Sequence, residues 1–346
     1  MFKYFLDNEK LGYNTCDYGG MEMLQKQKDE KENPIGNRMN RKYLYKYLKR
    51  DTKDNIQYYL LMFIPLILIL IFSYLPMFGI VIAFQDYFAG RPFFGEGVTW
   101  VGLKWFKEFI NSYYFGRILR NTLVINAMNL SMGFCVPILF AIIVNEIRSN
   151  KFKKFTQTVS YLPHFLSAVV AAGMVVNFLA DDGIITKFLN LLGFGVKSLN
   201  INAGAFPWIY TFTSIWKSFG WSSIIYLSTI AGIDPGLYEA AAIDGAGRIK
   251  KIWHITIPSM LPLIVIQLIL SIGGMLSSNT ELILLLYNSS TYKTADVIGT
   301  YVYRETLMGG RFSYGTAAGL FMSVIGFALT YVANAISRRT TEFSMW

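Results

Sequence analysis

The sequence is short of charged residues, cysteine and histidine, and each shortage excludes a class of function. Only 16% of the 346 residues are charged, whereas a soluble domain carries about a quarter. The two cysteines, Cys16 and Cys135, are too few for a disulfide framework and form no CxxC or Cys/His metal spacing. The two histidines, His164 and His254, lie far apart in the sequence. Neither a disulfide-stabilised domain nor a metal site is therefore expected.

Two functional segments are also missing. No G-x-x-x-x-G-K-[ST] loop is present, so the chain cannot itself cradle the phosphates of ATP. The first residues, MFKYFLDNEKLGYN, contain Asp7 and Glu9 and no apolar run, so no signal peptide is expected there. Residues 1–56 are instead expected to form a polar tail, in part helical near Lys42–Arg50, and residues 57–346 one membrane domain.

Apolar residues dominate what remains. They make up 53% of the chain, the mean hydropathy is +0.37, and the charges cluster between long apolar runs, as in a membrane protein. The formal net charge is +10. Because the basic residues lie mainly in the tail and in short loops beside apolar segments, lipid headgroups and membrane topology explain them better than nucleic acid does.

Six segments are long and apolar enough to cross a bilayer, which takes about 20 residues each. They are Tyr58–Phe84, Leu119–Val144, Val159–Ala180, Phe206–Ala231, Ser259–Leu276 and Gly315–Ile336. Pro65 and Pro76 lie within the first and predict a kink or an early exit. A further run, Leu282–Tyr287, is too short to span and is expected to dip into the bundle or to pack beneath an outer loop.

Lysines and arginines in the short loops predict the orientation, because cytoplasmic loops carry an excess of both. One side would hold the basic tail and the loop cations Arg148, Lys151, Lys153, Lys154, Arg248, Lys250, Lys251, Arg338 and Arg339. The opposite side holds Arg91, Lys104, Lys107 and Arg117, and few cations in its later loops. The first outer loop weakens the rule, but the total favours both termini inside. The segment Gly232–Pro258 is therefore expected in the cytoplasm.

This segment reads IDPGLYEAAAIDGAGRIKKIWHITIPSMLP and predicts two short helices. Asp234 suits an N-cap and Pro235 the first helical position. A helical spacing of i, i+3, i+4 and i+7 places four residues on one face: Leu237, Ala240, Ala241 and Asp244. The small alanines permit another backbone to approach closely.

Gly245 and Gly247 are expected to end the first helix, and Arg248–His254 can form the second before Pro258 opens the next span. A short helix, a glycine hinge and another short helix would then lie at the membrane surface. This geometry suits docking into a groove on a cytoplasmic partner.

The same segment resembles the EAA loop of ABC importer permeases, whose pattern is EAA-x3-G-x9-I-x-L-P. The EAA at Glu239–Ala241 is followed after three residues by Gly245, and nine residues later by ITIP at Ile255–Pro258. The departure is Ile257 where leucine is usual, which is a conservative change. The resemblance implies that the loop couples to an ATPase through Tyr238, Glu239, Ala240, Ala241, Asp244, Gly245 and Pro258.

Further segments resemble binding-protein-dependent sugar permeases: VGLKWFKEFI…RNTL, YLPHFLSAVV and IWKSFGWSSIIYL. LLLYN, ADVIGTYVYR, FSYGTAAGLF and Trp346 are similar to the subgroup that imports complex oligosaccharides, such as alginate-type and lipoprotein-type permeases. The subgroup usually has a glycine-phenylalanine pair before the acidic residue of SSNTELILLLYN. Here Asn279 and Thr280 precede Glu281, and this departure makes Asn279 and Glu281 candidate solute contacts.

The resemblance implies an all-α type I importer permease with six transmembrane helices in a bacterial cytoplasmic membrane. The implied partners are a second, homologous permease, two cytoplasmic ATPase subunits and an extracytoplasmic solute-binding protein. No cofactor is implied for this chain, because ATP and Mg would be used by the ATPase. The implied solute is an oligosaccharide, with a preference for an acidic, uronate-containing fragment.

Polar and aromatic residues within the spans are candidate solute contacts, because polar groups are costly in a membrane. Lys217 lies near the middle of the fourth span, with Thr213 and Trp221 four residues to either side. Trp216 and Tyr226 add aromatic surface. Sugars present apolar C–H faces beside hydroxyls, so aromatic rings with amides or a cation suit them.

Two roles are open for Lys217: it contacts an acidic sugar, or it pairs with another helix or a carbonyl. The structural role is favoured, because IWKSFGW is similar to a general feature of the subgroup. The same choice applies to four amides, for which hydrogen bonding between helices is the commoner role: Asn126, Asn129, Asn177 and Gln267.

Other function classes fit less well. A secondary transporter needs carboxylates within the membrane for ion coupling, and the six spans place none centrally. A channel would need a filter-like motif, and an enzyme paired carboxylates or clustered histidines. An ABC permease for a peptide, a metal or another small solute is the nearest rival, because it would keep the EAA loop.

Overall fold

The computed structural model of the protein describes residues 56–277, 279–340 and 344–345. The predicted helix near Lys42–Arg50 and the terminal Trp346 lie outside these residues. The chain divides into two compact units, residues 1–77 and 78–346. Each unit is described by itself, and the predicted boundary after residue 56 stays a prediction.

The described part of the first unit is one apolar helical stretch. It comprises α3 (Ile56–Ile69), the π-helical turn η1 (Leu70–Tyr74) and α4 (Leu75–Met77). Pro65 lies within α3 and Pro76 within α4. Because proline lacks an N–H and clashes with the carbonyl four residues earlier, a widened turn just before Pro76 is the expected response. The helical stretch Ile56–Phe84 is 29 residues long and apolar enough to cross a membrane, so the prolines do not end it early.

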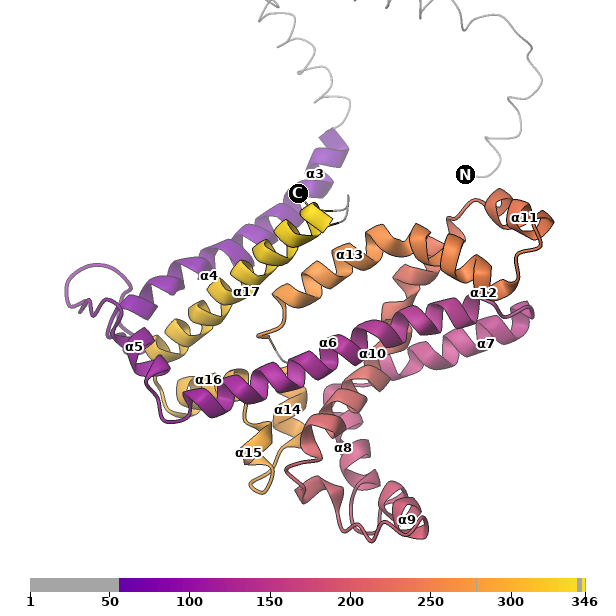
Figure 1. Ribbon diagram of the computed structural model, residues 1–346. Helices are drawn as coiled ribbons and strands as arrows, with labels where there is room; N and C mark the ends of the chain where they lie inside the picture. The colour runs from indigo at the N-terminus through magenta and orange to yellow at the C-terminus, as the bar shows by residue number, and fades with distance from the viewer. Residues whose placement is uncertain (1–55, 278, 341–343, 346) are drawn as a thin grey trace, which may run out of the picture. The chain divides into compact units, whose positions relative to one another are not determined.

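The described residues of the second unit fold into helices, and the β-structure among them is one isolated bridge between Gln85 and Trp100 (Figure 1). The elements are η2 (Phe78–Phe84), α5 (Lys104–Ile110), α6 (Phe115–Asn145), α7 (Asn150–Tyr161), η3 (Leu162–Phe165), α8 (Ala168–Phe178), α9 (Ile184–Leu191), η4 (Leu199–Ile201), α10 (Phe206–Ala231), α11 (Pro235–Ile243), α12 (Arg248–Lys251), η5 (Ile252–Thr256), α13 (Ile257–Gly273), α14 (Thr280–Leu286), α15 (Tyr292–Ala295), α16 (Ile298–Tyr303), η6 (Arg304–Met308) and α17 (Phe312–Thr340).

Four helical stretches in the described residues are long and apolar enough to span a membrane: Ile56–Phe84, Phe115–Asn145, Arg248–Gly273 and Phe312–Thr340. A bent pair, Asn150–Phe165 with Ala168–Phe178, makes up to five. Helix α10 has the bounds predicted for the fourth span, but Lys217 and several hydroxyl side chains lower its hydropathy. The predicted total of six is therefore not confirmed exactly.

The third predicted span, Val159–Ala180, is wrong as a single straight helix. The chain bends by 100° between η3 and α8. Pro163 lies in η3, and the hydroxyl of Ser167 caps the new helix by accepting a hydrogen bond from the Val170 N–H at 3.2 Å. A proline followed by a serine N-cap ends one helix and starts another.

Helix α6 contributes to each of three hydrophobic clusters in the second unit. The first joins it to α8, α10 and α14 around Tyr210 and Ile283, and the second joins it to α5, α16 and α17 around Phe109 and Tyr314. The third joins it to α10 and α13 around Tyr226 and Met260. The run predicted to be too short to span forms α14, whose Leu282, Ile283 and Leu286 are buried. This burial agrees with both predicted placements of the run, into the bundle and beneath an outer loop.

Candidate functional site

The segment between α10 and α13 forms the helix, glycine turn and helix that its sequence predicts. Asp234 caps α11, because its carboxylate accepts a hydrogen bond from the Gly236 N–H at 2.9 Å. Gly245 has a φ of +73°, a left-handed conformation that glycine adopts without strain. The predicted second helix, Arg248–His254, is α-helical over Arg248–Lys251 and continues as the π-helical turn η5.

Helix α11 exposes most of the residues that the EAA resemblance singles out. Glu239, Ala240 and Asp244 are exposed, Ala241 is half-buried, and Leu237 and Ile243 expose apolar side chains beside them. Two further exposed apolar residues, Ile249 and Trp253, follow in α12 and η5. Helices α9 and α11 lie at opposite ends of α10 (Figure 1). An exposed face of small and apolar residues at one end of the unit can receive a partner groove.

Tyr238 is half-buried and hydrogen-bonded to the elements that follow α11. Its hydroxyl is hydrogen-bonded to the Thr256 hydroxyl at 2.9 Å, and its carbonyl accepts a hydrogen bond from the Lys251 amine at 3.0 Å. Pro258 lies in the first turn of α13 and directly follows η5 within the continuous stretch Arg248–Gly273, so its missing N–H leaves a gap in the helical hydrogen bonds there.

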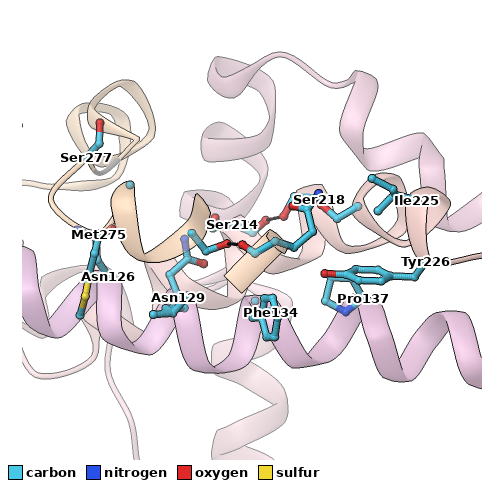
Figure 2. A pocket seen from close by; sticks show the side chains of 16 residues that line it. Asn126, Asn129, Phe134, Pro137, Ser214, Ser218, Ile225, Tyr226, Met275 and Ser277 are labelled. Carbon is cyan, nitrogen blue, oxygen red and sulfur yellow. Dashed lines mark hydrogen bonds between the residues drawn. The ribbon is translucent and has the colours of Figure 1, made fainter. Parts of the chain in front are cut away.

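A polar cavity of about 330 Å³ lies among α6, α10, α13 and the turn after α13 (Figure 2). Four of the predicted solute contacts line it: Asn126, Asn129, Tyr226 and Gln267. Three serines of α10 that were not predicted also line it, at a spacing of four residues: Ser214, Ser218 and Ser222. This spacing puts them on one helical face and was readable from the sequence.

Two of the hydroxyls in this cavity are hydrogen-bonded to carbonyls of their own helices. Ser218 donates to the carbonyl of Ser214, and Ser271 donates to the carbonyl of Gln267, each at 2.7 Å. Their oxygens can still accept hydrogen bonds from a solute. Pro137 also lines the cavity and has no N–H to donate to the carbonyl of Gly133. The lining therefore offers amides, hydroxyls and carbonyls, and none of its residues is charged.

The other predicted contacts lie elsewhere. Thr213 and Trp216 line an apolar pocket of about 600 Å³ among α8, α9 and α10. The ring of Trp221 stacks on His164, with centroids 4.5 Å apart and planes 3° from parallel. Lys217 is half-buried in α10 and is not among the residues that line the polar cavity. The predicted cluster of these residues is therefore divided among separate surfaces.

The last three candidates lie toward the ends of helices. Asn177 is exposed in α8. The Asn279 side chain caps α14 by accepting from the Leu282 N–H at 3.1 Å, and its backbone N–H donates to the Tyr210 hydroxyl at 3.2 Å. Glu281 is exposed in the first turn of α14. None of the three lines the polar cavity.

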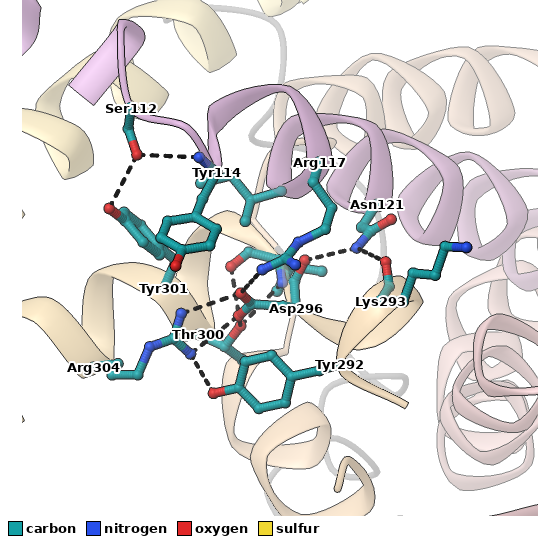
Figure 3. A network of polar contacts seen from close by, with 12 residues as sticks. Ser112, Tyr114, Arg117, Asn121, Tyr292, Lys293, Asp296, Thr300, Tyr301 and Arg304 are labelled. Carbon is teal, nitrogen blue, oxygen red and sulfur yellow. Dashed lines mark hydrogen bonds and ion pairs between the residues drawn. The ribbon is translucent and has the colours of Figure 1, made fainter. Parts of the chain in front are cut away.

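An ionic cluster around Asp296 was not predicted (Figure 3). The carboxylate of Asp296 is fully buried and accepts hydrogen bonds from Arg304 at 3.1 Å and from Arg117 at 3.4 Å. The Thr300 hydroxyl donates to it at 2.9 Å. Burial lowers the pKa of the Arg304 guanidinium, but the hydrogen bond and charge of Asp296 outweigh this effect, so the pKa is raised above its usual value. Arg117 is 179 positions from Asp296, so no local sequence pattern predicts this cluster.

A second ionic group lies near the first. Arg311 pairs with Glu305 at 3.2 Å and with Glu108 of α5. Together, the two groups tie the chain after α14 to α5 and to the first turn of α6.

Comparison with known proteins identifies the family to which this architecture belongs. Residues 133–342 match the model of the family described as binding-protein-dependent transport system inner membrane component. The polygalacturonan/rhamnogalacturonan transport system permease protein YteP of Bacillus subtilis (strain 168) is 44% identical over 290 residues, which are 83% of this chain and 89% of that protein.

Two solved structures are also similar. The crystal structure of a bacterial ABC transporter involved in the import of the acidic polysaccharide alginate has a chain 39% identical, with a TM-score of 0.76, covering 85% of this chain and 99% of that one. The crystal structure of a bacterial alginate ABC transporter in complex with an alginate pentasaccharide-bound periplasmic protein has a chain that is 38% identical, with a TM-score of 0.77. The match covers 86% of this chain and 99% of that one. The chain belongs to the binding-protein-dependent transport system inner membrane component family, and is thus a membrane permease of an ABC importer, a transport subunit and not an enzyme.

Proposed function

We propose that the chain carries an oligosaccharide across the membrane and that its polar cavity is the part of the path where the sugar binds. The uncharged lining of amides, hydroxyls and carbonyls carries this proposal. Each of these groups can exchange hydrogen bonds with sugar hydroxyls, and the ring of Tyr226 offers an apolar face for C–H groups.

The solute is proposed to be acidic. The similar permease of Bacillus subtilis is named for polygalacturonan and rhamnogalacturonan, and the similar solved transporters for alginate. Lys217, predicted from the sequence, is the candidate cation for a sugar carboxylate, although it is not among the residues that line the polar cavity. A structural pairing remains its alternative role.

The partners proposed are a second homologous permease, two cytoplasmic ATPase subunits that use ATP and Mg, and an extracytoplasmic solute-binding protein. Helix α11, with Glu239, the alanines and the Gly245 turn, would dock into a groove on one ATPase subunit. The exposure of these residues and of Leu237 and Ile243 supports this role. Both termini would then lie in the cytoplasm, on the side of α11.

A permease for a peptide or another non-sugar solute is less favoured, because the most similar proteins are named for polysaccharides. An ATP-independent secondary transporter is disfavoured by the family and by the absence of a carboxylate from the lining of the polar cavity.

The test is ATPase activity of the complex reconstituted in proteoliposomes with its binding protein. Binding protein loaded with an acidic oligosaccharide, such as an oligogalacturonate, should stimulate hydrolysis more than binding protein offered a neutral oligosaccharide. Glu239→Ala and Gly245→Pro should abolish stimulation while the ATPase subunits still co-purify. Normal transport by both variants would refute the docking role of α11, and stimulation by neutral sugars alone would refute the acidic solute.

A further inference from the structure

Helix α11 is hydrogen-bonded to the elements that follow it through one residue, Tyr238. Among the residues that the structure describes, the hydrogen bonds that connect α11 with α12 and η5 both involve Tyr238: its hydroxyl bonds to Thr256 at 2.9 Å, and its carbonyl accepts from Lys251 at 3.0 Å. Thr256 is 2% exposed, so its hydroxyl has little access to water. A displacement of α11 must therefore move η5 or break the Tyr238–Thr256 bond.

The turn that receives this bond lies within a long helical stretch. Thr256 is the last residue of the π-helical turn η5 and the N-cap of α13. Elements α12, η5 and α13 form one continuous helical stretch, Arg248–Gly273. Turn η5 ends two residues before Pro258, as η1 ends two residues before Pro76, and the missing N–H of each proline accounts for the widened turn. Because the turn is continuous with α13, movement at Thr256 acts on the end of that helix.

Helix α13 leads from this turn to the polar cavity. Gln267, which lines the cavity, lies 11 positions beyond Thr256, about 16 Å along a helix. Met260 is fully buried one turn beyond Thr256 and packs in the same cluster as Tyr226, whose ring also lines the cavity. Two routes therefore connect Thr256 with the cavity: helix α13 itself, and the hydrophobic cluster that contains Met260 and Tyr226.

We infer that the hydrogen bond between the hydroxyls of Tyr238 and Thr256 transmits the movement of α11 to α13 and the polar cavity. The two residues are positioning residues, which act through α13 and touch neither solute nor ATP. The inference rests on the proposed docking of α11 into an ATPase. It adds a specific hydrogen bond, between Tyr238 and Thr256, which the docking alone does not require.

The test uses variants that remove one hydroxyl and keep the shape of the side chain. Thr256→Val, which lies outside the docking face, should leave basal ATPase activity and ATPase co-purification intact, and Tyr238→Phe is compared with it. Both should lower the stimulation by loaded binding protein, and the solute imported per ATP, by about fivefold, roughly the value of one intramolecular hydrogen bond. Thr256→Ser, which keeps the hydroxyl, should couple like wild type.

The double variant Tyr238→Phe/Thr256→Val should be no worse than either single variant, because both remove the same bond. Matched controls are Tyr331→Phe, at an exposed tyrosine of α17, and Thr229→Val, whose hydroxyl bonds to the Ile225 carbonyl of its own helix. Both should couple normally. Normal coupling by Tyr238→Phe, additive losses in the double variant, or a Thr256→Ser loss equal to that of Thr256→Val would each overturn the inference.

The experiments distinguish a failure of the proposed docking of α11 from a failure of the inferred role of the Tyr238–Thr256 hydrogen bond. If Gly245→Pro uncouples the complex but Tyr238→Phe does not, α11 docks and its movement travels by another route. If neither variant affects coupling, the docking role itself is wrong.

Discussion

Asp296 is a fully buried carboxylate with two arginines as partners, and its removal should show how strongly the cluster holds the fold. Asp296→Asn keeps the shape but leaves Arg117 and Arg304 facing each other without a counter-charge. Losing one partner of a buried pair costs about 3–5 kcal/mol. Because both arginines are partly exposed, we expect a loss of about 2–3 kcal/mol, measured by thermal unfolding of the purified protein in detergent.

Glu108→Gln is the matched control for this variant. Glu108 is 42% exposed, and its partner Arg311 keeps Glu305, so the loss should be below about 1 kcal/mol. The raised pKa of Arg304 adds stability that is present below the ordinary arginine pKa and lost only as the pH rises through the folded value. Arg304 should therefore stay protonated between pH 6 and about 9, and its protonation should not contribute to the stability lost in Asp296→Asn over this range. Equal losses of stability in Asp296→Asn and Glu108→Gln would contradict the idea that burial of Asp296 makes its ion pairs more stabilising than those of Glu108.

Gln267 gives a second prediction for a single residue, because its amide lines the polar cavity from α13. Gln267→Leu should raise the KM of import, by about tenfold, since a hydrogen bond between an amide and a solute hydroxyl is lost and an apolar group takes its place. Basal ATPase activity should not change. The control is Leu268→Ala, at an exposed neighbour in the same helix. An unchanged KM in Gln267→Leu would exclude this amide from the solute path.

The limits of sequence reasoning are visible at these residues. The amides of α6 and α13 were predicted because polar groups in apolar runs stand out, and the polar cavity gathers three of them. The serines of α10 were overlooked because a serine in a helix is individually unremarkable, although their spacing was readable. Asp296 could not be paired with Arg117 from the sequence, because only folding brings the two together.

Between elements, α7 and α10 approach most closely at Gly220. A Cβ atom added there would lie 2.0 Å from the backbone oxygen of Ser160, so one helix would have to move. Gly220→Ala should cost roughly 3 kcal/mol through overpacking and lower the yield of folded protein, as measured by size-exclusion chromatography and thermal unfolding.

Gly173→Ala provides the comparison within a neighbouring helix. No atom lies within 4 Å of the position that its Cβ would take, and alanine favours a helix over glycine. Its stability should therefore be unchanged or slightly higher. If Gly220→Ala were as stable as Gly173→Ala, the close approach of α7 and α10 would not be a constraint on the fold.

Helix bounds were predictable where hydropathy and caps agree, and less so where they conflict. The bounds of α10 match the predicted span, because Pro207 starts it and the Gly232–Asp234 segment ends it. The bend between η3 and α8 was missed because the apolar run continues across it. Pro163 and Ser167 were the signals that should have divided the run.

For the whole molecule, the orientation proposed here can be tested by cysteine labelling. In a variant in which Cys16 and Cys135 are replaced, Lys151→Cys in α7 should react with a membrane-impermeant maleimide only after permeabilisation. Asn190→Cys in α9 should react in intact cells or spheroplasts. Both positions are exposed. The reverse pattern would place α11 on the outer side and would remove the basis for its docking to a cytoplasmic ATPase.

The uncharged lining of the polar cavity has a consequence for the energetics of import. Bacterial membranes are negative inside, and moving one charge against that potential costs about 2.3 kcal/mol per 100 mV. An anionic sugar would enter against this electrical gradient at every turnover, and because the cavity lining carries no charge, the cost falls on the step that moves the loaded cavity. Collapsing the membrane potential should therefore accelerate uptake of an acidic oligosaccharide and leave uptake of a neutral one unchanged.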